Sequence, residues 1–216
     1  MTDLAAAFTP YENLAAQLIP FACGSDDGSH DIAHILRVFR NAMRILREEE
    51  GHGGVVAAAV LLHDCVAVEK NSPLRAQASR LSADKACGLL RNMGWAQIDI
   101  AAVAHAITTH SFSANSPPET LEAKILQDAD RLDAIGAIGV VRCFYIAGRM
   151  KSSLYDVADP AGGRRPLDDR RFALDHFPAK LFKLADEFQT EAGRRMAAER
   201  HARLVAFHRQ FLDEIG

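Results

Sequence analysis

The chain has 216 residues, of which 49% are hydrophobic and 25% are charged, and its formal net charge at pH 7 is −3. This length and apolar content predict a single domain with a packed core rather than a disordered chain. The weakly negative charge argues against duplex nucleic acid as a partner, because that ligand needs a broad basic surface. The longest apolar stretch, 55–62, is too short to cross a bilayer, so no membrane span is expected.

The cysteines and the N-terminus indicate a cytoplasmic protein. The four cysteines are widely spaced and form no CxxC pair, which argues against a disulfide scaffold or a zinc knuckle. Residues 1–10 contain Asp3 and neither Lys nor Arg, unlike the start of a secretory signal peptide. We therefore expect free thiols in a reducing compartment.

Apolar residues recur mostly at spacings of three and four, which predicts an all-α fold. In chain order, helices are expected at 4–18, from a cap at Ser29 or Asp31 to about residue 50, and at 55–66, 82–93 and 96–109. The helix at 55–66 is apolar on all sides until its end, so it should be buried completely. A long helix should begin at Pro117 and Pro118 and continue past Tyr145.

The remainder of the chain divides into a loop and a helical C-terminus. Residues 151–171 contain Pro160, Gly162, Gly163 and Pro166, which predict a mobile loop that is either disordered or a lid over a site. Residues 178–215 return to a helical pattern, and their amphipathic face predicts a homodimer contact. With no internal repeat or linker, 1–216 is interpreted as one domain with a core at about 29–148.

The most informative residues are His63 and Asp64, an adjacent pair at the end of the apolar helix. Two unpaired polar side chains buried there would cost several kcal/mol, roughly 2–7 for each group. One bound divalent cation would satisfy both side chains, provided that they lie near a helix end, because neighbours on a helix point about 100° apart.

Two further residues complete a candidate metal-binding set. His34 lies early on its predicted helix, and Asp130 lies within a third helix, so three helices would converge on one ion. His30 competes with His34, but it precedes the helix and is interpreted as a cap or surface group. Asp128 competes with Asp130 and is interpreted as a cap or a solvent-facing residue. Two imidazoles and two carboxylates suit a divalent transition metal better than Ca²⁺.

The order H…HD…D in a helical chain resembles the HD superfamily of metal-dependent phosphohydrolases. The resemblance rests on SHDIAHILRV around His34, LLHDC around His63 and Asp64, and ILQDADRLDAIGAIGVVR around Asp130. It covers roughly residues 29–148 and is closest to the small single-domain bacterial branch. It implies a compact helical bundle with the metal where the helices converge, and one ion held by these four residues.

The resemblance also implies hydrolysis of a small phosphate ester or anhydride by Lewis-acid catalysis. A nucleotide is the expected substrate, as a triphosphate releasing pyrophosphate or a monophosphate releasing phosphate. Mn²⁺ is the preferred metal, with Co²⁺, Ni²⁺, Fe²⁺, Zn²⁺ and Mg²⁺ as the other candidates. Asp133, His110 and Asp64 are the candidate catalytic groups, and the candidate substrate contacts are Lys70, Arg37, His105, Arg142 and Arg164.

Two other interpretations of the same residues stay open. If His105 and His110 add ligands, the site would hold two metals, as in the HD oxygenases and phosphodiesterases. No HHxxxxGYP-type segment follows the HD pair, which argues against the phosphodiesterases that open cyclic dinucleotides. The last alternative is a metal-stabilised nucleotide-binding module without activity.

Overall fold

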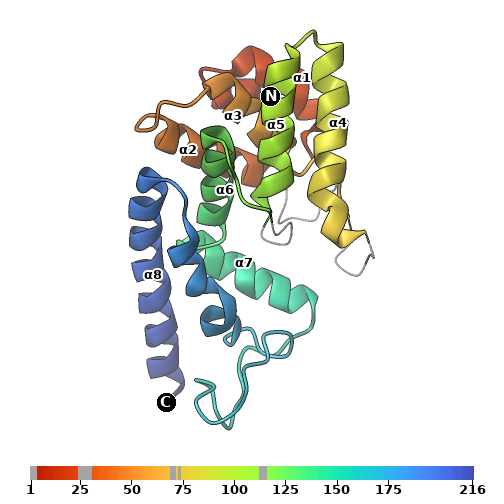
Figure 1. Cartoon of the computed structure of the whole chain (residues 1–216). Coiled ribbons are helices and arrows are strands. Elements are labelled where there is room, and N and C mark those ends of the chain that lie inside the picture. The colour runs from red at the N-terminus through yellow and green to blue at the C-terminus, as the bar shows by residue number, and fades with distance from the viewer. Residues whose placement is uncertain (1–3, 24–30, 69–71, 73, 112–115) are drawn as a thin grey trace. The chain divides into compact units, whose positions relative to one another are not determined.

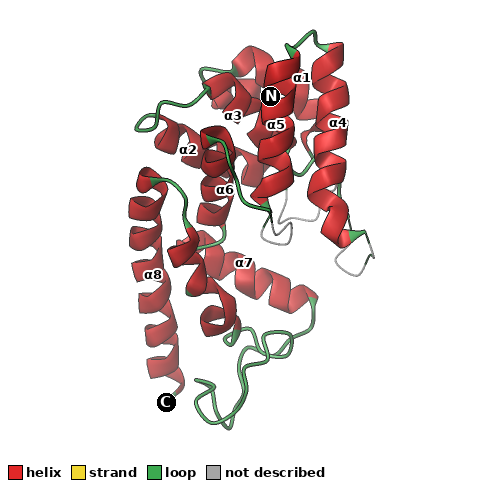
Figure 2. Ribbon diagram, viewed as in Figure 1, coloured by secondary structure: helices red, strands yellow, loops and turns green. Residues whose placement is uncertain are grey.

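The computed structural model describes residues 4–23, 31–68, 72, 74–111 and 116–216. Every regular element in these ranges is a helix (Figure 2), so the all-α prediction is confirmed. None of the described helices combines the length and the apolar character needed to cross a membrane. The chain forms two compact units, Met1–Asp130 and Arg131–Gly216, and the boundary lies within helix α6 (Leu121–Asp133).

Helix α3 (Gly53–Leu62) is the centre of the first unit. It packs against α1 (Glu12–Ala22), α2 (Ile32–Leu46) and α5 (Gln97–His110). All residues from 55 to 62 are buried, which explains why this helix is apolar on every side, as the sequence predicted. Helix α4 (Ala78–Asn92) runs beside α5 (Figure 1).

The N-terminal helix differs from the prediction. Residues Leu4–Phe8 form a separate short helix, η1, and α1 continues through Pro20 to Ala22 rather than ending before the proline. A proline removes one backbone hydrogen bond from a helix. Because Leu18 and Ala22 are both fully buried, tertiary packing holds this last turn despite the missing bond.

The long helix predicted from Pro117 past Tyr145 is two helices. Helix α6 ends at Asp133, and α7 (Gly136–Arg149) begins after a tight turn. Gly136 has a φ of +72°, which residues with a side chain rarely adopt, and a Cβ on Gly139 would lie 2.3 Å from the carbonyl oxygen of Ala134. The two glycines therefore make the turn that ends α6 just after Asp130.

The second unit contains α7, the short helices η4 (Phe177–Leu181) and η5 (Lys183–Glu187), and α8 (Glu191–Ile215). The helices predicted within 178–215 are thus η4, η5 and α8, and the first turn of α8 is capped by the Thr190 hydroxyl accepting from Gly193 N at 2.9 Å. Four aromatic rings, with centroids about 6 Å apart, pack around the fully buried Phe177, namely those of Phe144, Phe177, Phe207 and Phe211.

The segment 151–171 is tied to the residues that follow it. Arg165 makes a two-pronged ion pair with Asp175, at 2.5 and 2.8 Å, and its guanidinium lies 4.7 Å from the ring centroid of Phe172. Ser153 O accepts from Ala173 N at 2.9 Å. The mobility of this loop and its action as a lid stay predictions. The assignment of residues 1–216 to one domain also stays a prediction.

Candidate metal centre

His34 is placed by the start of α2. The side chain of Asp31 caps this helix by accepting a hydrogen bond from the backbone N–H of His34 at 2.9 Å. The cap fixes His34 in the first turn of the helix, where its side chain is 1% exposed. His30 lies outside the described residues, so its expected role as a cap or surface group is not addressed by the structure.

His63 and Asp64 directly follow α3, which ends four residues earlier than predicted, at Leu62. The Nδ1 atom of His63 lies 2.7 Å from the carbonyl oxygen of Val60. Since a carbonyl oxygen only accepts, Nδ1 carries the proton, and Nε2 keeps its lone pair for a ligand. The position after the helix end lets the two neighbouring side chains point the same way, as the metal-binding interpretation required.

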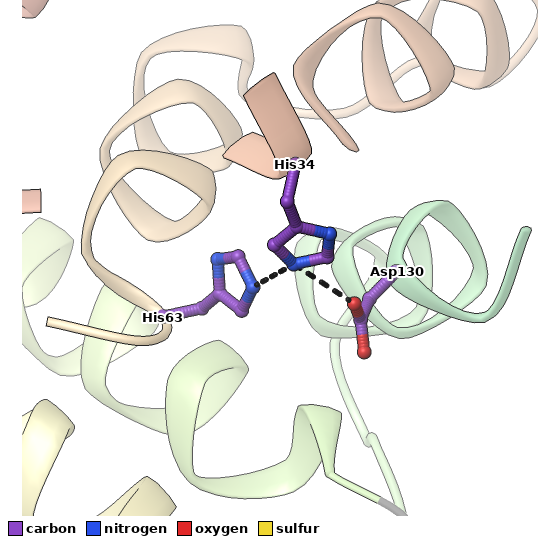
Figure 3. A group of neighbouring side chains, drawn as sticks. All are labelled: His34, His63 and Asp130. Atoms are coloured by element: carbon purple, nitrogen blue, oxygen red, sulfur yellow. Dashed lines mark hydrogen bonds and ion pairs between the residues drawn. The ribbon is translucent and has the colours of Figure 1, made fainter. Parts of the chain in front are cut away.

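His34 and His63 converge with Asp130 of α6 inside the first unit (Figure 3). The Nε2 atom of His34 lies 3.2 Å from Nε2 of His63 and 3.5 Å from Oδ1 of Asp130. The Oδ2 atom of Asp64 lies 3.5 Å from Nε2 of His63 and 3.9 Å from Nε2 of His34. Asp128, the competing carboxylate, is fully buried elsewhere on α6, in place of the expected cap or solvent-facing position.

The donor set fits one transition-metal ion. Ligands about 2.1 Å from one ion lie roughly 3.0 Å apart at a right angle and roughly 4.2 Å apart on opposite sides. The observed separations of 3.2, 3.5 and 3.9 Å fall within this span. Because the imidazoles are buried and the carboxylates are partly exposed, the cluster has a protein side and an open side, which suits an ion that also binds water or substrate.

A family model of the HD domain matches residues 31–135, the part of the chain that supplies all four of these side chains. The uncharacterized protein YpgQ of Bacillus subtilis is 33% identical over 194 residues, which cover 88% of this chain and 86% of YpgQ. This chain belongs to the HD-domain superfamily.

Solved HD structures agree with the fold. The crystal structure of Bacillus subtilis YpgQ in complex with ADP has a TM-score of 0.73 at 34% identity, and the match covers 93% of this chain and 97% of that one. An HD-superfamily hydrolase from Bacillus thuringiensis has a TM-score of 0.68 at 29% identity, covering 98% of this chain and 95% of its own. The Bacillus thuringiensis relative supports the hydrolase class for this HD chain.

His110, at the end of α5, extends the HD cluster on the other side of Asp64. Its Nε2 atom lies 3.9 Å from Oδ1 of Asp64, and its ring centroid lies 5.1 Å from that of His63. Its Nδ1 atom lies 2.6 Å from the carbonyl oxygen of Ile107, so Nε2 again carries the lone pair. Burial, and then the neighbouring His63, lower the pKa of His110, which keeps the imidazole neutral at pH 7.

Two buried amides that the sequence analysis did not single out tie the ligand-bearing helices of the HD domain together. Asn41 of α2 donates through Nδ2 to the carbonyl oxygen of Ala129 at 3.0 Å, one residue before Asp130. Gln127 of α6 donates through Nε2 to the carbonyl oxygen of Thr109 at 2.8 Å, one residue before His110. Their signal in the sequence is a polar residue at a position where the helical spacing predicts burial.

The structure does not gather all the predicted catalytic and substrate residues in the HD cluster. His105 Nε2 accepts from the backbone N–H of Glu119 at 3.0 Å. In the second unit, Arg142 pairs with Asp133 at 2.8 Å, and the exposed Arg164 donates to the carbonyl oxygen of Ala158 at 2.7 Å. Arg37 is half-buried on α2, and Lys70 lies outside the described residues.

Proposed function

We propose that this HD protein is a metal-dependent phosphohydrolase that acts on a nucleotide, with His34, His63, Asp64 and Asp130 as the metal ligands. The observation that carries the proposal is that Nε2 of His34 lies within 3.9 Å of Nε2 of His63 and of one carboxylate oxygen each of Asp64 and Asp130. Nucleotides are favoured over other phosphate esters because YpgQ, at 34% identity, was crystallised with ADP.

When bound there, a divalent metal polarises a phosphoryl oxygen and lowers the pKa of its water. The protein's own side chains orient the metal ligands and accept the proton of the attacking water. Asp64 presents one carboxylate oxygen to His63 and the other to His110. His110 is a neutral imidazole with a lone pair on Nε2. We therefore propose that it is the general base that accepts the proton from the attacking water.

The other candidate catalytic and substrate-binding residues differ in how well the structure supports a role in the reaction. We give Asp133 and Arg142 no part in the reaction, because they form an ion pair with each other, with Nη1 of Arg142 2.8 Å from Oδ2 of Asp133. Arg37, Lys70, His105 and Arg164 stay candidates for contacts with the phosphates. A metal other than Mn²⁺ would suit the same ligands, since imidazole and carboxylate rank the first-row divalent ions only loosely.

The test is the release of phosphate and pyrophosphate from a panel of nucleoside mono- and triphosphates. Metal-stripped protein is supplied with Mn²⁺, Co²⁺, Ni²⁺, Mg²⁺ or Zn²⁺ in turn, and Asp64→Ala is the matched variant. We expect one transition metal to support release in the wild type and none to support it in Asp64→Ala. Release that is equal in both proteins, or absent with every nucleotide and metal, would refute the proposed activity.

A second candidate function has its own observation. His63, Asp64 and His110 form a second group whose ligand atoms lie within 4.8 Å of one another, and this group shares His63 with the group of His34, His63 and Asp130, so the cluster holds a pair of overlapping groups. Such a pair would suit a dinuclear HD oxygenase. Two equivalents of iron per chain in the purified protein, without nucleotide hydrolysis, would favour this function over the phosphohydrolase.

A further inference from the structure

The turn that carries His63 and Asp64 is held by a helix that supplies none of the proposed ligands. Both residues follow the end of α3, in a turn that is spanned by the backbone hydrogen bond from Cys65 N to Leu62 O at 3.2 Å. Helix α4 contributes two side chains to this turn, Ser82 and Lys85, which lie on one face of the helix at a spacing of three.

Three contacts join α4 to the residues immediately after Asp64. The hydroxyl of Ser82 accepts from the backbone N–H of Val66 at 3.2 Å, and the thiol of Cys65 lies 3.5 Å from the carbonyl oxygen of Ser82. Lys85 donates from Nζ to the carbonyl oxygen of Cys65 at 2.8 Å. The backbone on the C-terminal side of Asp64 is therefore fixed at successive residues.

Ser82 is 1% exposed, although serine is usually an exposed residue. A buried hydroxyl without a partner costs free energy, so its bond to Val66 N accounts for its burial. Lys85 is an exposed residue, and its bond to Cys65 O is charge-assisted, which makes it stronger than a bond between neutral groups.

The orientation of the Asp64 side chain depends on the backbone of this turn more than the orientations of His34 and His63 depend on their own backbone. Its side chain is 34% exposed, whereas those of His34 and His63 are 1% and 0% exposed and packed on all sides. A rotation of the backbone at Asp64 would move Oδ2 away from His63 and Oδ1 away from His110. We propose that Ser82 and Lys85 are positioning residues that hold the carboxylate of Asp64 in its metal-binding geometry.

This inference rests on the metal centre of the proposed function. Hydrogen-bond partners behind a ligand typically change metal affinity by about 10–100-fold when they are removed. The test is calorimetric titration of Mn²⁺ into the metal-stripped full-length protein, with Ser82→Ala, Lys85→Met and Lys85→Arg. The matched controls are Ser79→Ala, a buried serine one turn earlier on α4, and Lys124→Met on α6.

We expect the Kd for Mn²⁺ to rise about tenfold in Ser82→Ala and Lys85→Met. It should return close to the wild-type value in Lys85→Arg, which restores a charged donor, and stay unchanged in both controls. Urea unfolding of the metal-free proteins should give similar midpoints for Lys85→Met and Lys124→Met, so that weaker binding in Lys85→Met is not a consequence of partial unfolding.

Two outcomes overturn the inference, and Asp64→Ala separates them. If Asp64→Ala loses Mn²⁺ binding while Ser82→Ala and Lys85→Met bind as the wild type does, the metal centre stands and the positioning role is wrong. If Asp64→Ala itself binds Mn²⁺ with wild-type affinity, the assignment of Asp64 as a ligand fails, and the role of α4 fails with it.

Discussion

The Nε2 atoms of His34 and His63 lie 3.2 Å apart, although 29 positions separate the residues in the chain. Because Nδ1 of His63 donates to Val60 O, the Nε2 atom of a neutral His63 imidazole carries a lone pair. A nitrogen lone pair facing another ring nitrogen at this distance needs a proton or a cation between them. The carboxylates of Asp64 and Asp130 beside it favour the cation.

His110→Ala should separate catalysis from metal binding. If His110 accepts a proton in the reaction, its loss should lower metal-dependent kcat by about 10²–10⁴-fold and leave the Kd for the metal unchanged. Steady-state kinetics and calorimetry on the same preparation measure both quantities, with His176→Ala as a control on a half-buried histidine of the second unit. A large rise in the metal Kd would instead make His110 a ligand, as the dinuclear alternative requires.

Asn41→Ala should weaken both the fold and the metal site. The substitution removes the donor to Ala129 O from a residue that is 4% exposed, and we expect a loss of roughly 1–3 kcal/mol in the free energy of unfolding. Because Ala129 precedes Asp130, metal affinity should fall as well. Urea unfolding followed by the single tryptophan, Trp95, measures the first effect, with the exposed Asn92→Ala as control. Equal stability in the two variants would contradict the prediction.

The sequence was sufficient to predict the helical fold, because spacings of three and four persist through most of the chain. It was also sufficient for α3, whose uninterrupted apolar residues required burial on all sides. It did not predict the ends of the helices equally well. The break between α6 and α7 depends on the close approach of Gly139 to the carbonyl oxygen of Ala134. A glycine inside an apolar pattern does not by itself predict such a contact.

Within the site, the sequence indicated His34, His63, Asp64 and Asp130 through their order and helical context, and the structure brings them together. Asn41 and Gln127 were missed because the partner of each amide is a backbone carbonyl on another helix, which the sequence does not reveal. Asp133 was singled out by periodicity, and its expected role at the site stays a prediction. It lies one turn beyond Asp130, yet its carboxylate is engaged by Arg142.

The Arg165–Asp175 pair should make stability depend on pH in the acid range. Burial alone would raise the pKa of Asp175, but hydrogen bonds from Arg165 and Asp168 N and the charge of Arg165 together lower it. The folded state then binds fewer protons than the unfolded state. The stabilisation is fully present above the unfolded pKa, about 3.9, and is lost as the pH falls through the lower folded value.

Asp175→Asn should therefore unfold more easily than the wild type at neutral pH, and the difference should shrink below about pH 4. Urea unfolding at several pH values measures the difference, with Asp169→Asn as a control on a more exposed carboxylate. A difference between wild type and Asp175→Asn that stays constant from pH 7 to pH 3 would contradict the assignment of the lowered pKa to this ion pair.

The most direct test of the metal centre is the stoichiometry and affinity of metal binding in four variants, His34→Ala, His63→Ala, Asp64→Ala and Asp130→Asn. Each is stripped of metal and titrated with Mn²⁺ by calorimetry beside the wild type and His176→Ala. We predict tight binding of Mn²⁺ by the wild type and the control, and a loss of at least about tenfold in affinity in each of the four variants. Wild-type affinity in His63→Ala and Asp64→Ala would contradict the assignment of this cluster as the metal centre.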